Sequence, residues 1–576
     1  MAKTRYEDRN DTVEEKLRLL RLAREAGNYD LALSLAASIR ETLWFERQRR
    51  GNVAEPDSNA GMFAKVGELP KPWARWATGW SYYKVLAIDE TVAQARTQEP
   101  VDVSIGFRAE QTNDLRREVR VARVDPTGGT LREVPVQVYE EAWQEGAARL
   151  GERRCRLIFL ADAPAHGRAT YLVFYGNPYA ELPDYQTDLQ VRGKGFGLDV
   201  ENQHFVAHLS HQMGQLDRLT YKASGLELFA GGDSHGEPPN VDWGHDYRSD
   251  FQKYRIRNWD TCPNFEIVKG PLCIQVHRWG FPHSPAHPLF TPSRMQISVT
   301  YKFYAGLPYF IKQGSLEAAK PFDFIYLRDD EWIFSGFPFT DTANSDKRDT
   351  VGLFNRDTRD AFIALYLEHR AQNFDGKLNA SYPASLKMGT SRVLQGWSRW
   401  AASGNVHFEP GTRLFQKNVY FLGSYPKQGG PKMIEQLRHR LSNPLSVSVS
   451  ELPADVKPAA RGTLARTGET LHTAPLKQAI WNALGEVQDQ QLYTADTNIR
   501  DMGYVYDVRV RGGHVRVLFT MPNRGRPMSG WFGKPIRVRL QKLKGVQDCT
   551  VTFTWEPAWM MARMNAAARR AIGLPL

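Results

Sequence analysis

The sequence predicts a mixed fold with an N-terminal helical hairpin, a large and mainly β sandwich body, and a small C-terminal α/β domain. Three observations support it: apolar residues recur at helical intervals in residues 12–48, short strand-like runs fill residues 73–451, and helix and strand patterns alternate in residues 474–576. A chain of 576 residues, 42% of them hydrophobic, exceeds what one core usually serves, so we expect two or three domains.

The first element, residues 1–50, is expected to be the helical hairpin. Thr12 and Glu15 have the spacing of a capping box in front of the first helix, and Asp30 is placed to cap the second. Basic residues end the second helix, where they suit the negative pole of its dipole. Residues 51–72 then form a predicted linker.

The β body is divided into two predicted sandwich domains, residues 73–200 and residues 201–451. Its runs are rich in Val, Ile, Tyr, Phe and Trp and are separated by Gly, Pro, Asn and Asp, which is typical of β-sandwich construction. Examples of these expected strands are Val101–Phe107, Tyr171–Tyr175, Met295–Tyr304 and Phe322–Leu327. Residues 452–473, with prolines and many small polar residues, form a second predicted linker.

The C-terminal domain, residues 474–576, alternates helical and strand-like segments. We expect, in order, a helix at 476–484, strands at 503–511 and 514–521, a helix at 533–542, a strand at 550–555 and a helical tail at 560–572.

The cysteines and the apolar runs predict where the protein resides. Four scattered cysteines, none in a C-x-x-C pair, do not make a disulfide framework, and buried small side chains are the simpler interpretation. The first ten residues are polar, and no segment approaches the roughly 18 apolar residues that a membrane span requires. We therefore expect a cytoplasmic protein with no membrane partner.

The positive charge is unevenly distributed. The net charge is +11, and residues 470–576 contribute +8 of it, with 15 Lys or Arg against 7 Asp or Glu. The chain has no Lys/Arg run, aromatic RNA-binding motif or zinc finger, so the pattern does not favour nucleic acid as a partner. We interpret the positive charge instead as a basic face that binds a protein partner or an anionic ligand.

Three stretches of the C-terminal domain carry a resemblance to a known family: LKQAIWNALGEVQD, IRDMGYVYDVRVRGGHVRVLFTMP and VTFTWEPAWMMARMNAAARRAIG. Together they resemble the PaaD/SufT-like metal-sulfur cluster biosynthesis family, which implies a role in assembling or delivering iron-sulfur clusters to other proteins. The family commonly has a Gly-Cys-Pro turn where this chain has Gly525, Arg526 and Pro527, and its acidic D-P-E turn is reduced to Asp489 followed by glutamines. The resemblance with these departures implies a scaffold that docks another subunit.

The body carries a second resemblance. Residues 101–178, with VPVQV and YLVFYGNP, are similar to a β-sandwich domain of bacterial carbohydrate-associated proteins. The stretch GFGLDVENQHFVAHLSHQMGQLDRLTY resembles the opening hairpin of the large sandwich in sugar-processing enzymes, with a turn at Gly214. Residues 100–440 together resemble a polysaccharide-lyase-like architecture, which implies carbohydrate metabolism.

Residues 231–287 hold the richest set of polar side chains, in a stretch that reads as a long irregular loop. Histidine nitrogen and aspartate oxygen are suitable ligands for a divalent metal. The metal-ligand candidates are His235, Asp242, His245 and Asp246. A solvated, hydrogen-bonded loop is the alternative, because the spacing matches no known metal motif.

Without a metal, the same region offers groups for β-elimination on a uronic acid. His245 or Tyr247 would act as the general base, and Arg255 or Arg278 would neutralise the developing negative charge. His277 is a further catalytic candidate, and Trp243 and Trp279, together with Arg278, are candidates for binding the sugar. Core packing is the alternative for the tryptophans.

Two functions follow from these patterns. The first is a carbohydrate-active enzyme or enzyme subunit, a carbon-oxygen lyase or a glycan-degrading subunit acting on a sugar. The second is a non-catalytic assembly subunit of a multi-subunit metalloenzyme, with a protein partner or a second copy of the chain bound through residues 1–50 and 474–576.

Overall fold

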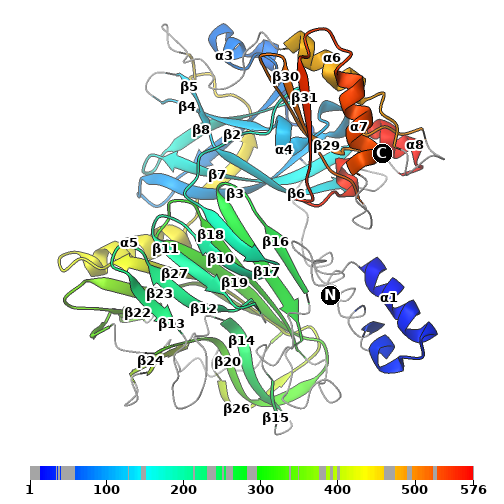
Figure 1. Ribbon diagram of the computed structural model, residues 1–576. Helices are drawn as coiled ribbons and strands as arrows, with labels where there is room; N and C mark the ends of the chain where they lie inside the picture. Colours follow the sequence, from blue (N-terminus) through cyan, green and yellow to red (C-terminus); the bar gives the residue numbers. More distant parts are fainter. Residues whose placement is uncertain are drawn as a thin grey trace. The chain divides into compact units, whose positions relative to one another are not determined.

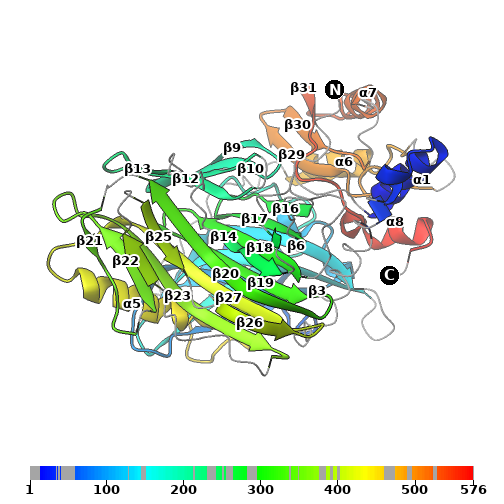
Figure 2. The ribbon, with the colours of Figure 1, turned by 90° about the horizontal axis from the view of Figure 1, so that it is seen from below.

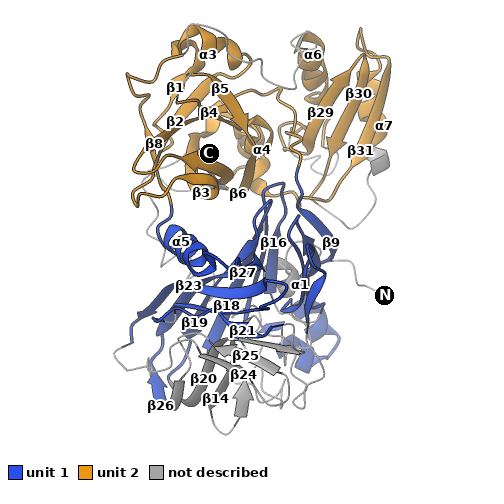
Figure 3. Cartoon of the chain, turned by 90° about the vertical axis from the view of Figure 1, so that its left-hand side faces the viewer, with its two compact units in different colours: residues 1–55, 187–444 blue, residues 56–186, 445–576 orange. Residues whose placement is uncertain are grey.

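The computed structural model (Figure 1) describes most of the chain. The described residues are 13–33, 35–36, 39, 59–126, 129–144, 151–211, 214–229, 242–249, 252–254, 264–281, 295–335, 339–347, 349–374, 385–388, 393–397, 402–458, 474–489, 496–522 and 529–574. They belong to two compact units (Figure 3): unit 1 comprises Met1–Glu55 and Thr187–Pro444, and unit 2 comprises Pro56–Gln186 and Leu445–Leu576. In the described part of the chain, no helix is both long and apolar enough to cross a bilayer.

The N-terminal segment contains helix α1 (Val13–Glu25), followed by a turn and further helical residues at 29–33. Gly27 has the left-handed φ of +69° that ends a helix. The expected cap of the second helix was wrong by two residues, because Asn28, and not Asp30, accepts a hydrogen bond from the backbone of Leu31 (3.2 Å).

An eight-stranded antiparallel sheet forms the centre of unit 1, in the order β16-β17-β18-β19-β27-β23-β22-β21. Figure 2 shows its long middle strands side by side. The strands are β16 (Asn264–Val268), β17 (Cys273–Gly280), β18 (Met295–Tyr304), β19 (Tyr309–Ala318), β21 (Asp341–Thr342), β22 (Thr350–Phe354), β23 (Asp360–Gln372) and β27 (Arg413–Ser424). Helix α5 (Gly430–Ser442) packs against β23.

A five-stranded sheet, β13-β12-β11-β10-β9, covers one face of the eight-stranded sheet. The strands are β9 (Gln190–Lys194), β10 (Gly197–Glu201), β11 (Phe205–Leu209), β12 (Leu216–Tyr221) and β13 (Leu226–Phe229). Phe205 lies 6.4 Å from Phe303 and 6.0 Å from Phe310, ring centre to ring centre, so aromatic rings join the two sheets. The expected hairpin around Gly214 is confirmed as β11 and β12.

A third sheet of unit 1 has the order β15-β14-β20-β25-β24, and β26 also pairs with β20. The strands are β14 (Asp242–Ser249), β15 (Gln252–Tyr254), β20 (Phe322–Ser335), β24 (Ser385–Met388), β25 (Val393–Trp397) and β26 (Ala402–Phe408). The expectation of one irregular loop over residues 231–287 was wrong. Strands β14, β15, β16 and β17 lie within it, because backbone pairing with neighbouring strands satisfies the polar main chain there.

Unit 2 begins with a β sandwich. One sheet has the order β1-β2-β8-β4-β5 with β28 on β2, and the other has the order β3-β7-β6. The strands are β1 (Ala64–Lys65), β2 (Tyr82–Asp89), β3 (Arg96–Arg108), β4 (Arg120–Val124), β5 (Leu131–Val134), β6 (Val136–Gln144), β7 (Glu152–Ala163), β8 (Arg168–Tyr175) and β28 (Ser446–Ser450). Ring contacts of Phe107 with Tyr175 (4.7 Å) and of Phe159 with Tyr171 (5.2 Å) join the sheets.

Two short helices complete the sandwich: α3 (Lys71–Trp76) and α4 (Leu115–Glu118). Trp73 of α3 is fully buried, and its indole nitrogen donates to the carbonyl of Gly129 (2.7 Å). Strand β28 pairs with β2 over five residues, so the chain has already returned to unit 2 before residue 452.

The C-terminal domain of unit 2 is a three-stranded sheet, β29-β30-β31, with helices on one face. Its elements are α6 (Ala474–Leu484), β29 (Val505–Arg511), β30 (His514–Phe519), α7 (Ser529–Leu540), β31 (Asp548–Phe553) and α8 (Ala566–Ala571). The order expected from the sequence is confirmed, and the mixed fold of helical start, β body and small α/β domain is confirmed with it. Strands β29 and β30 are antiparallel, whereas β30 and β31 are parallel.

Candidate functional site

The C-terminal domain is built around a buried carboxylate at the position where the acidic turn was expected. Asp489 is 2% exposed, and the hydroxyl of Tyr504 donates to it (2.7 Å). Burial, together with the nearby Asp489, raises the pKa of Tyr504 well above its ordinary value, so the hydroxyl keeps its proton. Asp489 is therefore held inside the domain, where it cannot act as an exposed ligand.

A glycine allows the segment after β31 to pack closely on this core. Gly503 has a φ of +69°, and a Cβ atom there would lie 2.3 Å from the carbonyl oxygen of Arg563. The same turn is fastened by Asn565, whose side chain donates to Asp501 (2.9 Å). The absence of a side chain at Gly503 thus allows the backbone of Arg563 to pack directly against this turn.

The C-terminal domain is joined to the sandwich of unit 2 through two groups of buried charges. The first is centred on Glu181, which follows β8. Lys477 of α6 donates to it (2.8 Å), and Arg511 of β29 makes two further bonds (2.7 and 3.0 Å). Burial would raise the pKa of Glu181, but the bonds from Arg511 and Lys477 hold it below its ordinary value. The carboxylate therefore stays charged between the two partners.

The second group is centred on Arg563, which is 5% exposed. Its guanidinium contacts Asp114 (3.2 Å) and Glu141 (3.7 Å), both in the sandwich. Burial would lower the pKa of Arg563, but these two carboxylates raise it, so the charge is retained. Nearby, the guanidinium of Arg117 lies 4.3 Å from the ring centre of Trp481 on α6. A charged joint of this kind makes the C-terminal domain an integral part of unit 2.

The thiols in the described residues are not available as cluster ligands. Cys155, Cys273 and Cys549 are all buried. Burial raises the pKa of Cys549, and the positive charge of Arg537 offsets this only in part. The turn at Gly525, Arg526 and Pro527 lies outside the described residues, and the sequence has no cysteine there.

Five of the predicted site residues of unit 1 lie on β14: Asp242, Trp243, His245, Asp246 and Tyr247. The structure describes their backbone and not their side chains. Asp242 pairs with Glu331 and Tyr247 with Leu327 on β20, and β14 also contacts β18. His235 and Arg255 lie outside the described residues. These assignments remain predictions, and no group of metal-binding side chains occurs among the residues that the structure describes.

The remaining three predicted residues lie next to one another on β17. The imidazole of His277 stacks on Trp279, with ring centres 4.6 Å apart, and its Nε2 lies 2.9 Å from the hydroxyl of Ser298. Arg278 is 1% exposed and lies over the ring of Tyr301 (5.5 Å). Because strand residues alternate, Arg278 faces away from His277 and Trp279. Trp279 is 7% exposed, so it offers little open surface to a sugar.

The sequence-based reasoning missed one polar cluster of unit 1, in the hairpin of β10, β11 and β12. His208 lies between two carboxylates: its Nδ1 pairs with Asp199, and its Nε2 lies 3.7 Å from Asp217. Burial raises the pKa of Asp217, and His208 partly offsets this. The ring of His211 lies 5.9 Å from that of His208. The strand pairing of β10 with β11 places Asp199 opposite His208, so a prediction of this register would have found the pair.

Two solved structures cover larger parts of the chain at low identity. An α-mannosidase from Enterococcus faecalis V583 is 10% identical, with a TM-score of 0.39, and covers 76% of this chain and 51% of its own length. This chain thus spans about half of that protein. A galactose mutarotase-like protein from Lactobacillus casei ATCC 334 is 14% identical, with a TM-score of 0.22, and covers 41% of this chain and all of its own. Both TM-scores lie below 0.5.

The C-terminal domain gives the stronger comparison. Residues 477–553 match the family described as iron-sulfur cluster assembly protein. An Fe-S protein maturation auxiliary factor of Bacillus subtilis (strain 168), YitW, is 30% identical over 100 residues, which are 17% of this chain and 95% of that protein. Through this domain, the chain belongs to the iron-sulfur cluster assembly protein family.

Proposed function

We propose that this protein is a cytoplasmic auxiliary factor in the maturation of iron-sulfur proteins, and that it acts by docking a protein client and not by carrying the cluster on its own thiolate. The observation that carries this proposal is the charged joint around Glu181 and Arg563. It builds the family domain into a larger unit while leaving the described cysteines buried. A module that is fixed in place and lacks an exposed thiol is suited to holding a partner.

The N-terminal segment supports a second contact with a partner. Several large apolar side chains of the helical residues are exposed, among them Leu22 (48%), Tyr29 (67%) and Leu33 (70%). Exposed apolar residues in such number on one short segment are typical of a protein-protein contact. We therefore include residues 1–50, with residues 474–576, in the docking surface for the client.

The test is native purification from the source cells, followed by metal analysis and identification of bound subunits by mass spectrometry. The proposal expects a chain free of stoichiometric metal and bound to an iron-sulfur protein. A lone chain with stoichiometric metal would contradict it. Deleting residues 470–576 would be a poor variant, because it leaves Glu181 and Asp114 without their buried partners and threatens the fold of unit 2. Single surface substitutions are the sharper tool.

A second candidate function is a carbon-oxygen lyase or glycan-degrading activity of unit 1. It is favoured by the pair of His277 and Ser298, whose 2.9 Å contact lets the imidazole take a proton from, or give one to, the hydroxyl. The test measures turnover on a panel of oligosaccharides for wild type, His277→Ala and, as a control, His514→Ala in the C-terminal domain. Turnover lost only in His277→Ala, with the fold retained, supports this function, whereas equal turnover in all three removes the site.

A further inference from the structure

Strand β31 is an edge of the C-terminal sheet. In the described part of the chain it pairs with β30 and with no other strand. Thr554, just after β31, donates its N–H to the carbonyl of Phe519 on β30 (3.0 Å). Since successive residues of a strand direct their N–H and C=O groups to opposite sides, Thr550 and Thr552 direct theirs toward β30, whereas Cys549, Val551 and Phe553 direct theirs away from it. An open edge with unpaired main-chain groups results.

The edge lacks the proline and lysine residues that often block such pairing. Strand β31 contains no proline and no lysine, and Asp548, Thr550 and Thr552 are exposed. Its inward-facing residues, such as Cys549, belong to the core of the domain, so the strand is held firmly from one face. Main-chain pairing with an added strand would cost little ordering of the domain itself.

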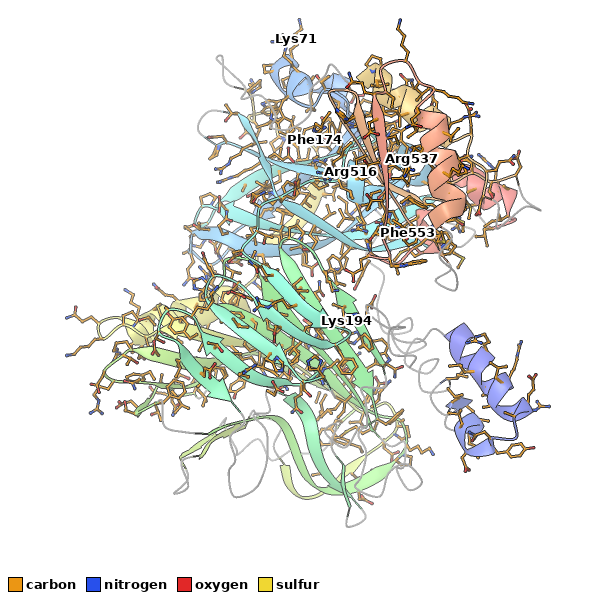
Figure 4. The ribbon with its side chains drawn as sticks, in the orientation of Figure 1. Lys71, Phe174, Lys194, Arg516, Arg537 and Phe553 are labelled. Atoms are coloured by element: carbon orange, nitrogen blue, oxygen red, sulfur yellow. The ribbon has the colours of Figure 1, made fainter. Side chains whose placement is uncertain are left out.

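Positive charge lies on both sides of this edge. Figure 4 labels Arg516 on β30, Arg537 on α7 and Phe553 on β31. Arg516 and Arg537 are exposed, and within the described residues neither has an ion pair. Arg537 is near enough to β31 for its charge to offset part of the rise that burial causes in the pKa of Cys549. Beside it, Val538 is 46% exposed and provides an apolar contact.

We infer that the open edge of β31 binds an extended, acidic segment of a client protein by addition of a strand. The main chain of the segment would pair with that of Val551 and Phe553, and its acidic side chains would face Arg516 and Arg537. This inference deepens the proposed function, since it assigns the client contact to one strand.

The probe is a capped, fluorescein-labelled heptapeptide of alternating Glu and Val, measured by fluorescence anisotropy with the full chain at low ionic strength. We expect saturable binding by wild type, and a loss of at least about tenfold for Val551→Pro, which removes an N–H from the open side and none from the pairing with β30. Arg537→Glu and Arg516→Glu should weaken binding by several fold, whereas Arg570→Glu, an exposed cation of α8, should not.

A second peptide keeps the test decisive if Val551→Pro does not fold. It has the same sequence with alternate amides N-methylated, so its charge is unchanged while its pairing groups are blocked. Equal binding of the two peptides, or equal binding by wild type and a folded Val551→Pro, overturns strand addition and leaves only charge attraction. If the peptide binds but no client copurifies, the proposed function is contradicted and strand addition at β31 is supported. If a client copurifies but the peptide does not bind, the proposed function is supported and strand addition at β31 is contradicted.

Discussion

Replacing Glu181 with Ala should destabilise the C-terminal domain by about 3 kcal/mol, because truncating one partner of a buried ion pair leaves the other charge uncompensated. The pair with Lys477 is well buried, with side chains 9% and 6% exposed. The pair with Arg511 contributes less, since that guanidinium side chain is 59% exposed and is screened by water. Most of the loss therefore comes from Lys477.

The loss is measured by hydrogen exchange of α6 and β29 peptides in increasing urea, because a chain with two units does not unfold in one step. Glu486→Ala is the matched control. Its partner Arg539 lies at the surface, with side chains 55% and 46% exposed, so less than about 1 kcal/mol should be lost.

A double variant refines the test. Glu181→Leu with Lys477→Met removes both charges, so it should cost less than the sum of the two single changes. The pKa of Glu181 is held below its ordinary value, so its stabilisation is complete above that value and disappears as the pH falls through the lowered pKa. Unchanged exchange of α6 and β29 in Glu181→Ala would show that the joint does not hold the domain.

Three further predictions concern single residues of unit 2. Burial lowers the pKa of Lys84 to about 7. Folding therefore releases its proton between that pH and about 10.4, the ordinary value, and the free energy of unfolding rises with pH across this window. Lys84→Met should remove this rise, measured as melting temperature against pH, and a rise that persists would contradict the assignment. Gly503→Ala should destabilise the domain by more than about 1 kcal/mol, whereas Gly533→Ala on α7, with nothing within 4 Å, should be neutral or stabilising in urea unfolding. Cys549 should react with a thiol reagent only after denaturation, and rapid labelling of the native chain, read by peptide mass mapping, would argue against its burial.

The C-terminal elements were predictable because each carries a complete local signal. Strand β30 alternates exposed His514 and Arg516 with buried Val515 and Val517, which is the pattern of a half-exposed strand. Its turn to β29 is marked by two glycines. The sequence therefore contained both the strand and its boundary.

The strands between residues 231 and 287 were missed for the opposite reason. Strand β17 is buried along nearly its whole length, so polar residues such as Gln275 and Arg278 do not alternate with apolar ones in a readable way. Histidines, prolines and glycines around β14 then resembled loop composition. The pairing with β20 that defines β14 joins residues far apart in the sequence, and spacing along the chain carries no trace of it.

The candidate sites show the same limit. The contact of His277 with Ser298 depends on the register of β17 and β18, and the joint of Glu181 with Lys477 bridges almost 300 positions. Both residue types were visible in the sequence, but their partners were not. The sequence alone showed only that Arg278 and Trp279 follow His277 along the chain, and the structure places Arg278 on the other face of the sheet.

Unit 2 is discontinuous, and this has a consequence for synthesis on the ribosome. When its first part, Pro56–Gln186, has emerged, β2 still lacks β28, and Glu181 and Asp114 still lack their cationic partners. At about 5–20 residues per second, translation of Thr187–Pro444 takes on the order of 10–50 seconds, during which this half remains incomplete. We expect the nascent chain to need protection over that interval, whereas unit 1 has all the strands of its three sheets as soon as the interval ends.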